Sequence, residues 1–140
     1  MRVFFIDIDG VLNNCTATGA FNEDSVDEVC VAILNEALRR TNSNVVIIST
    51  WKDSFGFESV KNFLYRKGVL ADSIIGATEK DLPKEDGIQK YLQHNKVDEF
   101  IIIDDALDLI DKKLKTRYFK TNSHSGLEPE EIDDITNYFK

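Results

Sequence analysis

Short apolar runs recur along the chain, and segments with the spacing of amphipathic helices separate them. Residues 3–6, 45–48 and 100–103 are apolar throughout, without the alternation of a strand that faces water on one side. Such runs are typical of strands that are buried on both faces. Strands of this kind, each followed by a helix, favour an α/β fold in which helices cover both faces of a parallel sheet.

The polar and glycine-containing stretches between these runs indicate where the strands and helices begin and end. We expect strands over about residues 2–7, 45–48, 73–75, 100–103 and 117–121. We expect helices over about residues 25–40, 57–67, 106–114 and 129–139, and another that starts at Pro83. Asp24 or Ser25 is a suitable cap for the first helix, Gly68 closes the second, and proline is favoured at a helix start. Because no repeat or linker interrupts the pattern, residues 1–140 are expected to form one domain.

Composition narrows the class of protein. The net charge of −8 disfavours non-specific binding to nucleic acid, although it leaves room for a local basic patch. No apolar run approaches the roughly 20 residues that span a bilayer, and Asp7 and Asp9 break the N-terminal run, so we expect no membrane partner and no signal peptide. Cys15 and Cys30 lack the spacing of metal ligands and are interpreted as reduced thiols. A cytoplasmic location is therefore expected.

Polar side chains follow several of the expected strands at the point where each strand ends. Asp7 and Asp9 follow the first strand, Ser49 and Thr50 follow the second, and Asp104 and Asp105 follow the run 100–103. Taken singly, such residues are common in turns and helix caps. In a parallel sheet, however, ligands bind outside the carboxyl ends of the strands. The set as a whole therefore predicts a binding or catalytic site at that edge.

The residue types favour phosphoryl chemistry. Neighbouring strands lie about 4.8 Å apart, so we expect Asp7, Asp9 and Asp105 to crowd one small volume and to repel one another. Mg²⁺ prefers such oxygen ligands, would relieve the repulsion and would hold a phosphate. A lysine such as Lys84 would balance the remaining negative charge, and a Ser or Thr hydroxyl would donate a hydrogen bond to a phosphate oxygen. An aspartate is also a competent nucleophile.

These motifs, in this order, resemble those of the haloacid dehalogenase (HAD) superfamily. The carriers are Asp7-x-Asp9-Gly10-Val11-Leu12, Ser49, Lys84 and the Asp104-Asp105 pair. The resemblance implies a Rossmann-like, three-layer fold with a five-stranded parallel sheet in the order 5-4-1-2-3, and a Mg²⁺-dependent phosphatase. It implies that Asp7 is the nucleophile and a metal ligand, and that Asp9 is the general acid and base and contacts the metal through its carbonyl. Ser49 would bind phosphate, with Thr50 as the alternative, and Lys84 would balance the negative charge. Asp104 and Asp105 would complete the metal site, with Asp105 in direct contact with the metal.

The chain also resembles a narrower group, the small HAD domains of "Swiss Army Knife" RNA-repair proteins. The shared features are Asp-Gly-Val-Leu-Asn at residues 9–13, Ser-Thr-Trp-Lys at residues 49–52 and the late Ser-Gly-Leu at residues 125–127. That group usually has Ser-Ser-Trp-Arg, and arginine at the start of the third motif. Here Lys52 and Lys84 keep the charge without the bidentate geometry of arginine.

The gaps between the motifs hold only elements of the core, so we expect no full cap domain. Residues 13–24 are expected to form a small flap over an open site, which favours large substrates, with nucleotide or nucleic-acid terminal phosphates preferred over phosphoproteins. Gly10, Trp51 and Lys52 are grouped with the substrate-binding residues. Trp51 would stack on a base or sugar, and a core tryptophan is the competing interpretation. A non-catalytic metal- or phosphate-binding regulatory module and a phosphotransferase with the same nucleophile remain alternative functions.

Overall fold

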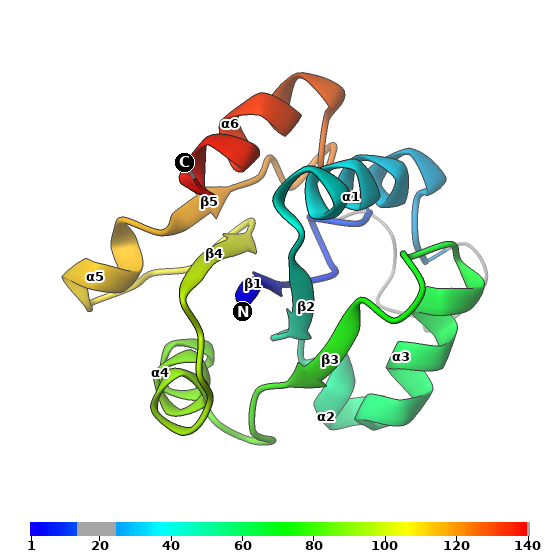
Figure 1. Ribbon diagram of the computed structural model, residues 1–140. Helices are drawn as coiled ribbons and strands as arrows, with labels where there is room; N and C mark the ends of the chain where they lie inside the picture. The colour runs from blue at the N-terminus through cyan, green and yellow to red at the C-terminus, as the bar shows by residue number, and fades with distance from the viewer. Residues whose placement is uncertain (14–24, 140) are drawn as a thin grey trace.

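A parallel sheet lies at the centre of the computed structural model, which describes residues 1–13 and 25–139 (Figure 1). Within these residues the sheet has five strands in the order β3-β2-β1-β4-β5. The strands are β1 (Arg2–Ile6), β2 (Asn44–Ile47), β3 (Ile74–Ala77), β4 (Glu99–Asp104) and β5 (Tyr118–Lys120). This is the order 5-4-1-2-3 read from the other edge, so the predicted fold class and topology are confirmed.

Helices cover both faces of the sheet. The α-helices are α1 (Glu28–Thr41), α2 (Trp51–Phe55), α3 (Phe57–Arg66), α4 (Lys84–His94), α5 (Lys112–Lys115) and α6 (Ile132–Thr136), with 3₁₀ turns η1 (Pro129–Glu131) and η2 (Asn137–Phe139) on either side of α6. Phe4 and Ile6 of β1 share a core with α1, α3 and α6, whereas Val3 and Phe5 share the opposite core with α4 and α5. Figure 1 shows α1 and α6 on one side of the sheet and α4 on the other.

The central strand explains why the apolar runs do not alternate. Residues 3–6 of β1 are fully buried because both faces of the strand meet a core. In the register of the sheet, Ile6 lies level with Ile47 of β2 and Ile103 of β4. The residues that follow these three therefore lie side by side at the carboxyl edge of the sheet. None of the helices in the described part of the chain is long and apolar enough to cross a membrane.

The helix expected over residues 106–114 is wrong in its first part, because side chains elsewhere capture the backbone N–H groups of that segment. Leu107 donates to the Tyr118 hydroxyl at 3.0 Å, and Ile110 and Asp111 donate to the Glu85 carboxylate at 2.9 and 2.7 Å. Buried Leu109 anchors the segment on the core. After this segment the chain becomes helical only at Lys112, where α5 begins, and the Asp111 side chain caps that helix.

Smaller differences concern helix ends. Asp27, rather than Asp24 or Ser25, caps α1 by accepting from Val29 N–H at 2.7 Å. The short helix α2, directly after Thr50, was not expected. The last helix is shorter than predicted, because 3₁₀ turns form both of its ends. Cys15 and the expected flap lie outside the described residues, apart from Asn13, while Cys30 is a buried free thiol.

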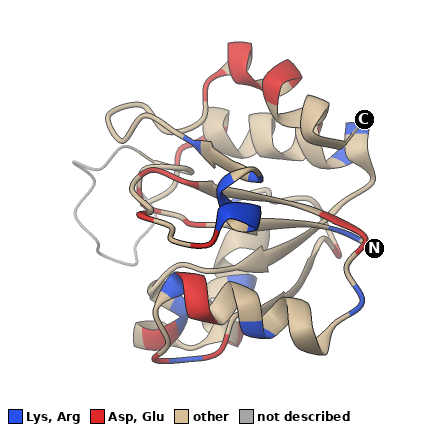
Figure 2. Ribbon diagram, turned by 90° about the vertical axis from the view of Figure 1, so that its left-hand side faces the viewer, with Lys and Arg blue, Asp and Glu red and all other residues tan. Residues whose placement is uncertain are grey.

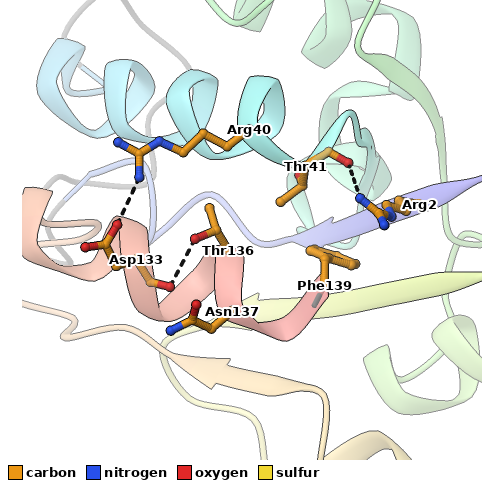
Figure 3. Close-up of a pocket in the computed structure, with 7 residues that line it drawn as sticks. All are labelled: Arg2, Arg40, Thr41, Asp133, Thr136, Asn137 and Phe139. Atoms are coloured by element: carbon orange, nitrogen blue, oxygen red, sulfur yellow. Dashed lines mark hydrogen bonds and ion pairs between the residues drawn. The ribbon is translucent and has the colours of Figure 1, made fainter.

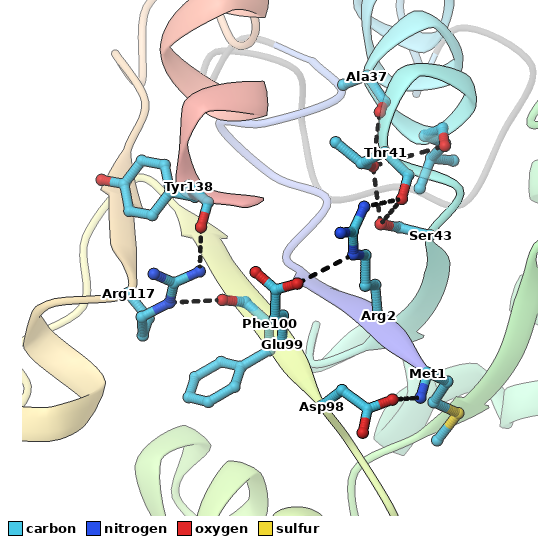
Figure 4. Close-up of polar contacts among 11 residues, drawn as sticks. Met1, Arg2, Ala37, Thr41, Ser43, Asp98, Glu99, Phe100, Arg117 and Tyr138 are labelled. Carbon is cyan, nitrogen blue, oxygen red and sulfur yellow. Dashed lines mark hydrogen bonds and ion pairs between the residues drawn. The ribbon is translucent and has the colours of Figure 1, made fainter. Parts of the chain in front are cut away.

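Ion pairs and hydrogen bonds close the opposite, amino-terminal edge of the sheet (Figure 4). The amino group of Met1 pairs with Asp98, and Arg2 pairs with Glu99 at 3.1 Å, so that the starts of β1 and β4 are joined. Arg117 donates to the carbonyls of β4 and η2. These contacts fix the sheet at the end away from Asp7 and Asp104, and so they support the strands that carry the carboxyl edge.

A hollow of about 590 Å³ lies at this same amino-terminal edge (Figure 3). Both arginines that line it have partners, because Arg40 pairs with Asp133 at 2.9 Å and Arg2 donates to the Thr41 carbonyl at 3.0 Å. Because Arg2 starts β1 and Thr41 lies just before β2, the hollow is at the end of the sheet remote from the predicted site.

The turn after β5 supports the loop after β1. Leu127 N–H donates to the Val11 carbonyl at 2.8 Å, and the Thr121 hydroxyl donates to the Gly10 carbonyl at 2.6 Å. Gly126 has a φ of 68°, and a Cβ there would lie 2.8 Å from the carbonyl oxygens of both Val11 and Asn13. Real Cβ atoms do not approach backbone this closely. Only glycine therefore lets the two loops pack together.

We expect Gly126→Ala to lower the free energy of unfolding by about 3 kcal/mol, from the strained φ and the overpacking together. Gly68→Ala is the matched control, because Gly68 also has a positive φ of 97° but its added Cβ would make only an ordinary contact, 3.9 Å from Val31. This control should lose only about 1 kcal/mol. Urea unfolding of both variants measures the difference, and equal losses would contradict the close packing of the two loops.

Candidate active site

An ion-pair bridge joins two neighbouring strands at the carboxyl edge. Asp7 directly follows β1 and Asp104 ends β4, and Asp7 N–H donates to the Ile103 carbonyl at 3.0 Å. The Lys84 ammonium lies 3.1 Å from Asp7 Oδ2 and 2.8 Å from Asp104 Oδ2. Both carboxylates are buried, with 6 % and 1 % of each residue exposed. One lysine therefore neutralises part of the charge of two buried acids.

The packing of α4 explains how Lys84 reaches this position. Lys84 is the first residue of α4, where the helix dipole disfavours a cation. The nearby carboxylates of Asp7 and Asp104 offset that cost. Gly87, in the next turn, lies so close to Thr78 that a Cβ there would be 3.0 Å from the threonine Cβ. The small residue thus lets the start of α4 approach the end of β3.

A third carboxylate completes an acidic cluster. Oxygen atoms of Asp7, Asp104 and Asp105 all lie within 4.8 Å of one another. A Cβ at Gly10 would overlap the Asp105 carboxylate, so the absence of a side chain at Gly10 makes room for this acid. Acidic positions recur in the loops at this edge, away from the N-terminus (Figure 2).

The cluster fits a hard divalent cation. Three carboxylates face one ammonium, which leaves a surplus of negative charge, and all the ligand atoms are oxygens. Both Asp104 oxygens have donors, since Oδ1 accepts from Ala106 N–H at 2.9 Å and Oδ2 pairs with Lys84. Among residues 1–13 and 25–139, no hydrogen-bond donor reaches the Asp105 carboxylate. Asp105 is therefore the acid with the most capacity to bind a metal ion.

The titration of these groups reflects their burial. Desolvation, together with the negative charge of Asp104, raises the pKa of Asp7 from 3.8 to about 6, although Lys84 offsets part of the increase. Desolvation also raises the pKa of Asp104, again against the effect of Lys84. For Lys84, burial alone would lower the pKa, but the charges of Asp7 and Asp104 outweigh it and raise the pKa. A bound cation would favour the charged form of both acids.

The carboxylate of Asp9 does not join the cluster, and the expectation that Asp7, Asp9 and Asp105 share one volume is wrong. The backbone does not stay extended as far as Asp9, because Val11 and Leu12 both donate to the Ile8 carbonyl and form a turn over residues 8–12. Asp9 instead accepts from the Trp51 indole N–H and from the Asn13 amide, each at 3.0 Å. Its carboxylate is thus held beside the acidic cluster rather than in it.

Ser49 and Thr50 differ in exposure. Ser49 is buried, and its Oγ accepts from the backbone N–H of Trp51 at 3.1 Å, while none of residues 1–13 and 25–139 accepts its hydroxyl proton. Thr50 is exposed and its side chain makes no capping hydrogen bond at the start of α2. Both hydroxyls stand at the carboxyl end of β2, next to the end of β1.

Three residues that were grouped with the substrate-binding set make contacts inside the chain. Trp51 is 3 % exposed and packs against Phe55 and Phe63, so its ring has no face for a base or sugar, and the core interpretation fits. The Lys52 ammonium is buried against the Asp53 carboxylate at 3.0 Å. Gly10 N–H donates to the Asn13 side chain at 2.9 Å. Through these contacts, Gly10, Trp51 and Lys52 support the structure around the site.

A family model for the HAD domain in Swiss Army Knife RNA repair proteins matches residues 3–132, from β1 to the start of α6. The chain belongs to this family. The resemblance inferred from the motifs is therefore confirmed, and membership of a HAD family indicates a phosphohydrolase-like function in general terms. No curated protein and no solved structure matches the chain significantly.

Part of the support of this HAD site comes from Asn13, which was not among the predicted site residues. Asn13 is buried and joins three positions, since it accepts from Gly10 N–H and donates to Asp9 and to the Ser25 carbonyl. In the sequence, Asn13 is the last residue of the shared Asp-Gly-Val-Leu-Asn motif. A polar amide directly after an apolar Val-Leu pair was the available signal, because buried amides are retained where they satisfy hydrogen bonds.

The raised pKa of Asp7 predicts that its carboxylate destabilises the fold when no cation is bound. The folded state binds this proton more tightly than the unfolded chain, so the contribution of Asp7 to stability is full below pH 3.8 and is lost as the pH rises to about 6. Without divalent cation, Asp7→Asn should raise the free energy of unfolding by about 1–3 kcal/mol at about pH 7.5, and the gain should shrink at about pH 4.

Urea unfolding at the two pH values measures this effect. Asp108→Asn is the control, because it removes the same charge from an exposed position and should change stability little. A variant less stable than wild type at both pH values would show that the pairing of Asp7 with Lys84 outweighs the cost of burial.

Proposed function

We propose that this HAD-family protein is a Mg²⁺-dependent phosphomonoester hydrolase that acts through an aspartyl-phosphate on Asp7. The observation that carries the proposal is the convergence of the buried Asp7 carboxylate, the Lys84 ammonium and the carboxylates of Asp104 and Asp105 within one small volume. Nucleophile, charge-balancing cation and metal ligands are the groups that phosphoryl transfer from a monoester needs. Family membership supports the general class of reaction.

In the first step, a carboxylate oxygen of Asp7 attacks the phosphorus, and the bond between the phosphorus and the ester oxygen breaks. Asp9, in its protonated form, gives its proton to the departing oxygen. Lys84 lies beside the Asp7 carboxylate and balances the charge of the phosphoryl oxygens. The Ser49 hydroxyl, whose proton no other described residue accepts, donates to one of those oxygens. The product is an alcohol and phosphorylated Asp7.

In the second step, water attacks the phosphorus, and the bond to the Asp7 oxygen breaks. The Asp9 carboxylate takes a proton from the attacking water, so inorganic phosphate leaves and both aspartates return to their starting forms. Mg²⁺ would be held by oxygen atoms of four residues. These are the carboxylates of Asp7, Asp104 and Asp105 and the backbone carbonyl of Asp9. When bound, this ion neutralises phosphoryl charge and orients the phosphate.

We further propose that the substrates are nucleotide or nucleic-acid terminal phosphates. The family is defined by HAD domains in RNA repair proteins, which supports a nucleic-acid end. The short connections around the carboxyl edge also support it, because α2 and α3 are the only helices between β2 and β3 in the described chain. An edge without a large cover on that side suits a phosphate at the end of a long molecule.

We expect phosphate release that requires Mg²⁺, stops with EDTA and falls at least about 1,000-fold in Asp7→Asn, since a variant that lacks its nucleophile retains only binding and electrostatic effects. The panel consists of p-nitrophenyl phosphate, nucleoside monophosphates and oligonucleotides phosphorylated at the 3′ or 5′ end. Asp108→Asn should keep wild-type rates. The ester with the highest kcat/KM identifies the substrate class.

The same assay separates the alternative functions. Folded protein that binds Mg²⁺ but releases no phosphate from any member would favour a regulatory module. Transfer of phosphate to an added alcohol in preference to water would identify a phosphotransferase. Full activity in Asp7→Asn would exclude the proposed nucleophile.

A further inference from the structure

Two side chains from different parts of the chain hold the carboxylate of Asp9. The Trp51 indole N–H donates to Oδ2, and the Asn13 amide donates to Oδ1, each at 3.0 Å. An ionised carboxylate has about four acceptor positions, so one on each oxygen remains for a proton and a reaction partner. The two contacts fix the orientation of the carboxyl group without using up its capacity to transfer a proton.

Trp51 is itself held firmly. Its backbone N–H donates to Ser49 Oγ at 3.1 Å, and its ring lies 6.2 Å from the ring of Phe55 and 6.1 Å from that of Phe63. The residue is 3 % exposed, so the direction of its N–H is set by the core. A buried tryptophan normally finds some partner for its N–H. Here that partner is an acidic residue two positions after the proposed nucleophile.

Asn13 is fixed in the same way from the other side. Its Nδ2 also donates to the Ser25 carbonyl at 2.8 Å, and its Oδ1 accepts from Gly10 N–H at 2.9 Å. The amide therefore cannot turn without loss of buried hydrogen bonds. Asp9 thus sits between two rigid donors, one from the start of α2 and one from the loop after β1.

We propose that Trp51 is a positioning residue for proton transfer by Asp9, which explains its place directly after the Ser49-Thr50 pair. This inference rests on the proposed function, because it assigns to Trp51 the orientation of the acid that protonates the departing ester oxygen. Orientation of a reacting group contributes strongly to rate, and a displaced acid is a poor acid. Loss of the indole N–H should therefore slow the reaction most where the departing oxygen needs a proton.

The test compares two esters in wild type and in Trp51→Phe, which keeps an aromatic ring and removes the donor. One ester is p-nitrophenyl phosphate, whose leaving group departs without protonation. The other is an alkyl ester, a nucleoside monophosphate, whose alkoxide needs the proton. We expect kcat/KM to fall at least about tenfold for the nucleotide and less than about threefold for p-nitrophenyl phosphate. An equal fall for both esters, or no fall for either, would overturn the inference.

Phe63→Leu is the matched control, because it removes a ring that packs on Trp51 and leaves the indole N–H in place. It should change kcat/KM for the two esters by the same small factor, because the Ser49 contact and the Phe55 ring still hold Trp51. If Trp51→Phe fails to fold, a second replacement remains. Trp51 is the single tryptophan of the sequence, so growth with β-(3-benzothienyl)alanine exchanges only this N–H for sulfur and keeps the bicyclic shape. The same selective loss for the nucleotide is expected.

A measurement independent of activity separates this inference from the proposed function. The single indole N–H gives one ¹H–¹⁵N NMR signal, which should shift in Asp9→Ala because its acceptor is lost. An unchanged signal would overturn the Trp51 role and leave the phosphatase proposal standing. Wild-type protein that releases no phosphate from either ester, while the indole signal responds to Asp9→Ala, would overturn the proposed function and with it the catalytic role of the contact.

Discussion

The bridge from Lys84 to the Asp7 and Asp104 carboxylates is the contact on which the rest of the site depends. Two carboxylates buried on neighbouring strands would repel each other strongly, and a partly buried ammonium between them makes the arrangement tolerable. The balance is incomplete, because Asp105 adds a third negative charge. The fold therefore maintains an acidic site whose excess negative charge a divalent cation would neutralise. This excess negative charge links the stability of the carboxyl edge to its chemistry.

Three layers of support hold that bridge in place. The register of β1 with β4 sets Asp7 beside Asp104, and the close contact of Gly87 with Thr78 brings the start of α4 to them. The turn after β5 packs closely against the loop after β1 at Gly126. Because each support comes from a different connection of the sheet, the site forms only when the whole sheet has assembled.

Much of this was predictable from local pattern. The apolar runs indicated a buried parallel sheet, and the polar residues at strand ends indicated the edge where a site would form, since both follow from the period and direction of strands. Other features depend on contacts between distant residues. The first part of the helix expected over residues 106–114 does not form, because the side chains of Glu85 and Tyr118 accept from its backbone N–H groups. The Asp9 carboxylate lies outside the cluster because the chain turns over residues 8–12. No local pattern encodes such partners.

The segment Ser49-Thr50-Trp51-Lys52 shows how a motif can act through the interior of the protein. On one side, the Trp51 indole contacts Asp9. On the other, the Lys52 ammonium lies 3.5 Å from the Glu79 carbonyl, and its partner Asp53 accepts from Asp81 N–H, so the pair contacts the loop that leads to Lys84. Lys52, at the position where the resemblance implies arginine, therefore makes a contact within the chain. A compact ammonium suffices for one carboxylate and one carbonyl, whereas the fork of an arginine would serve a phosphate. These contacts join Lys52 and Asp53 to the loop that leads to Lys84.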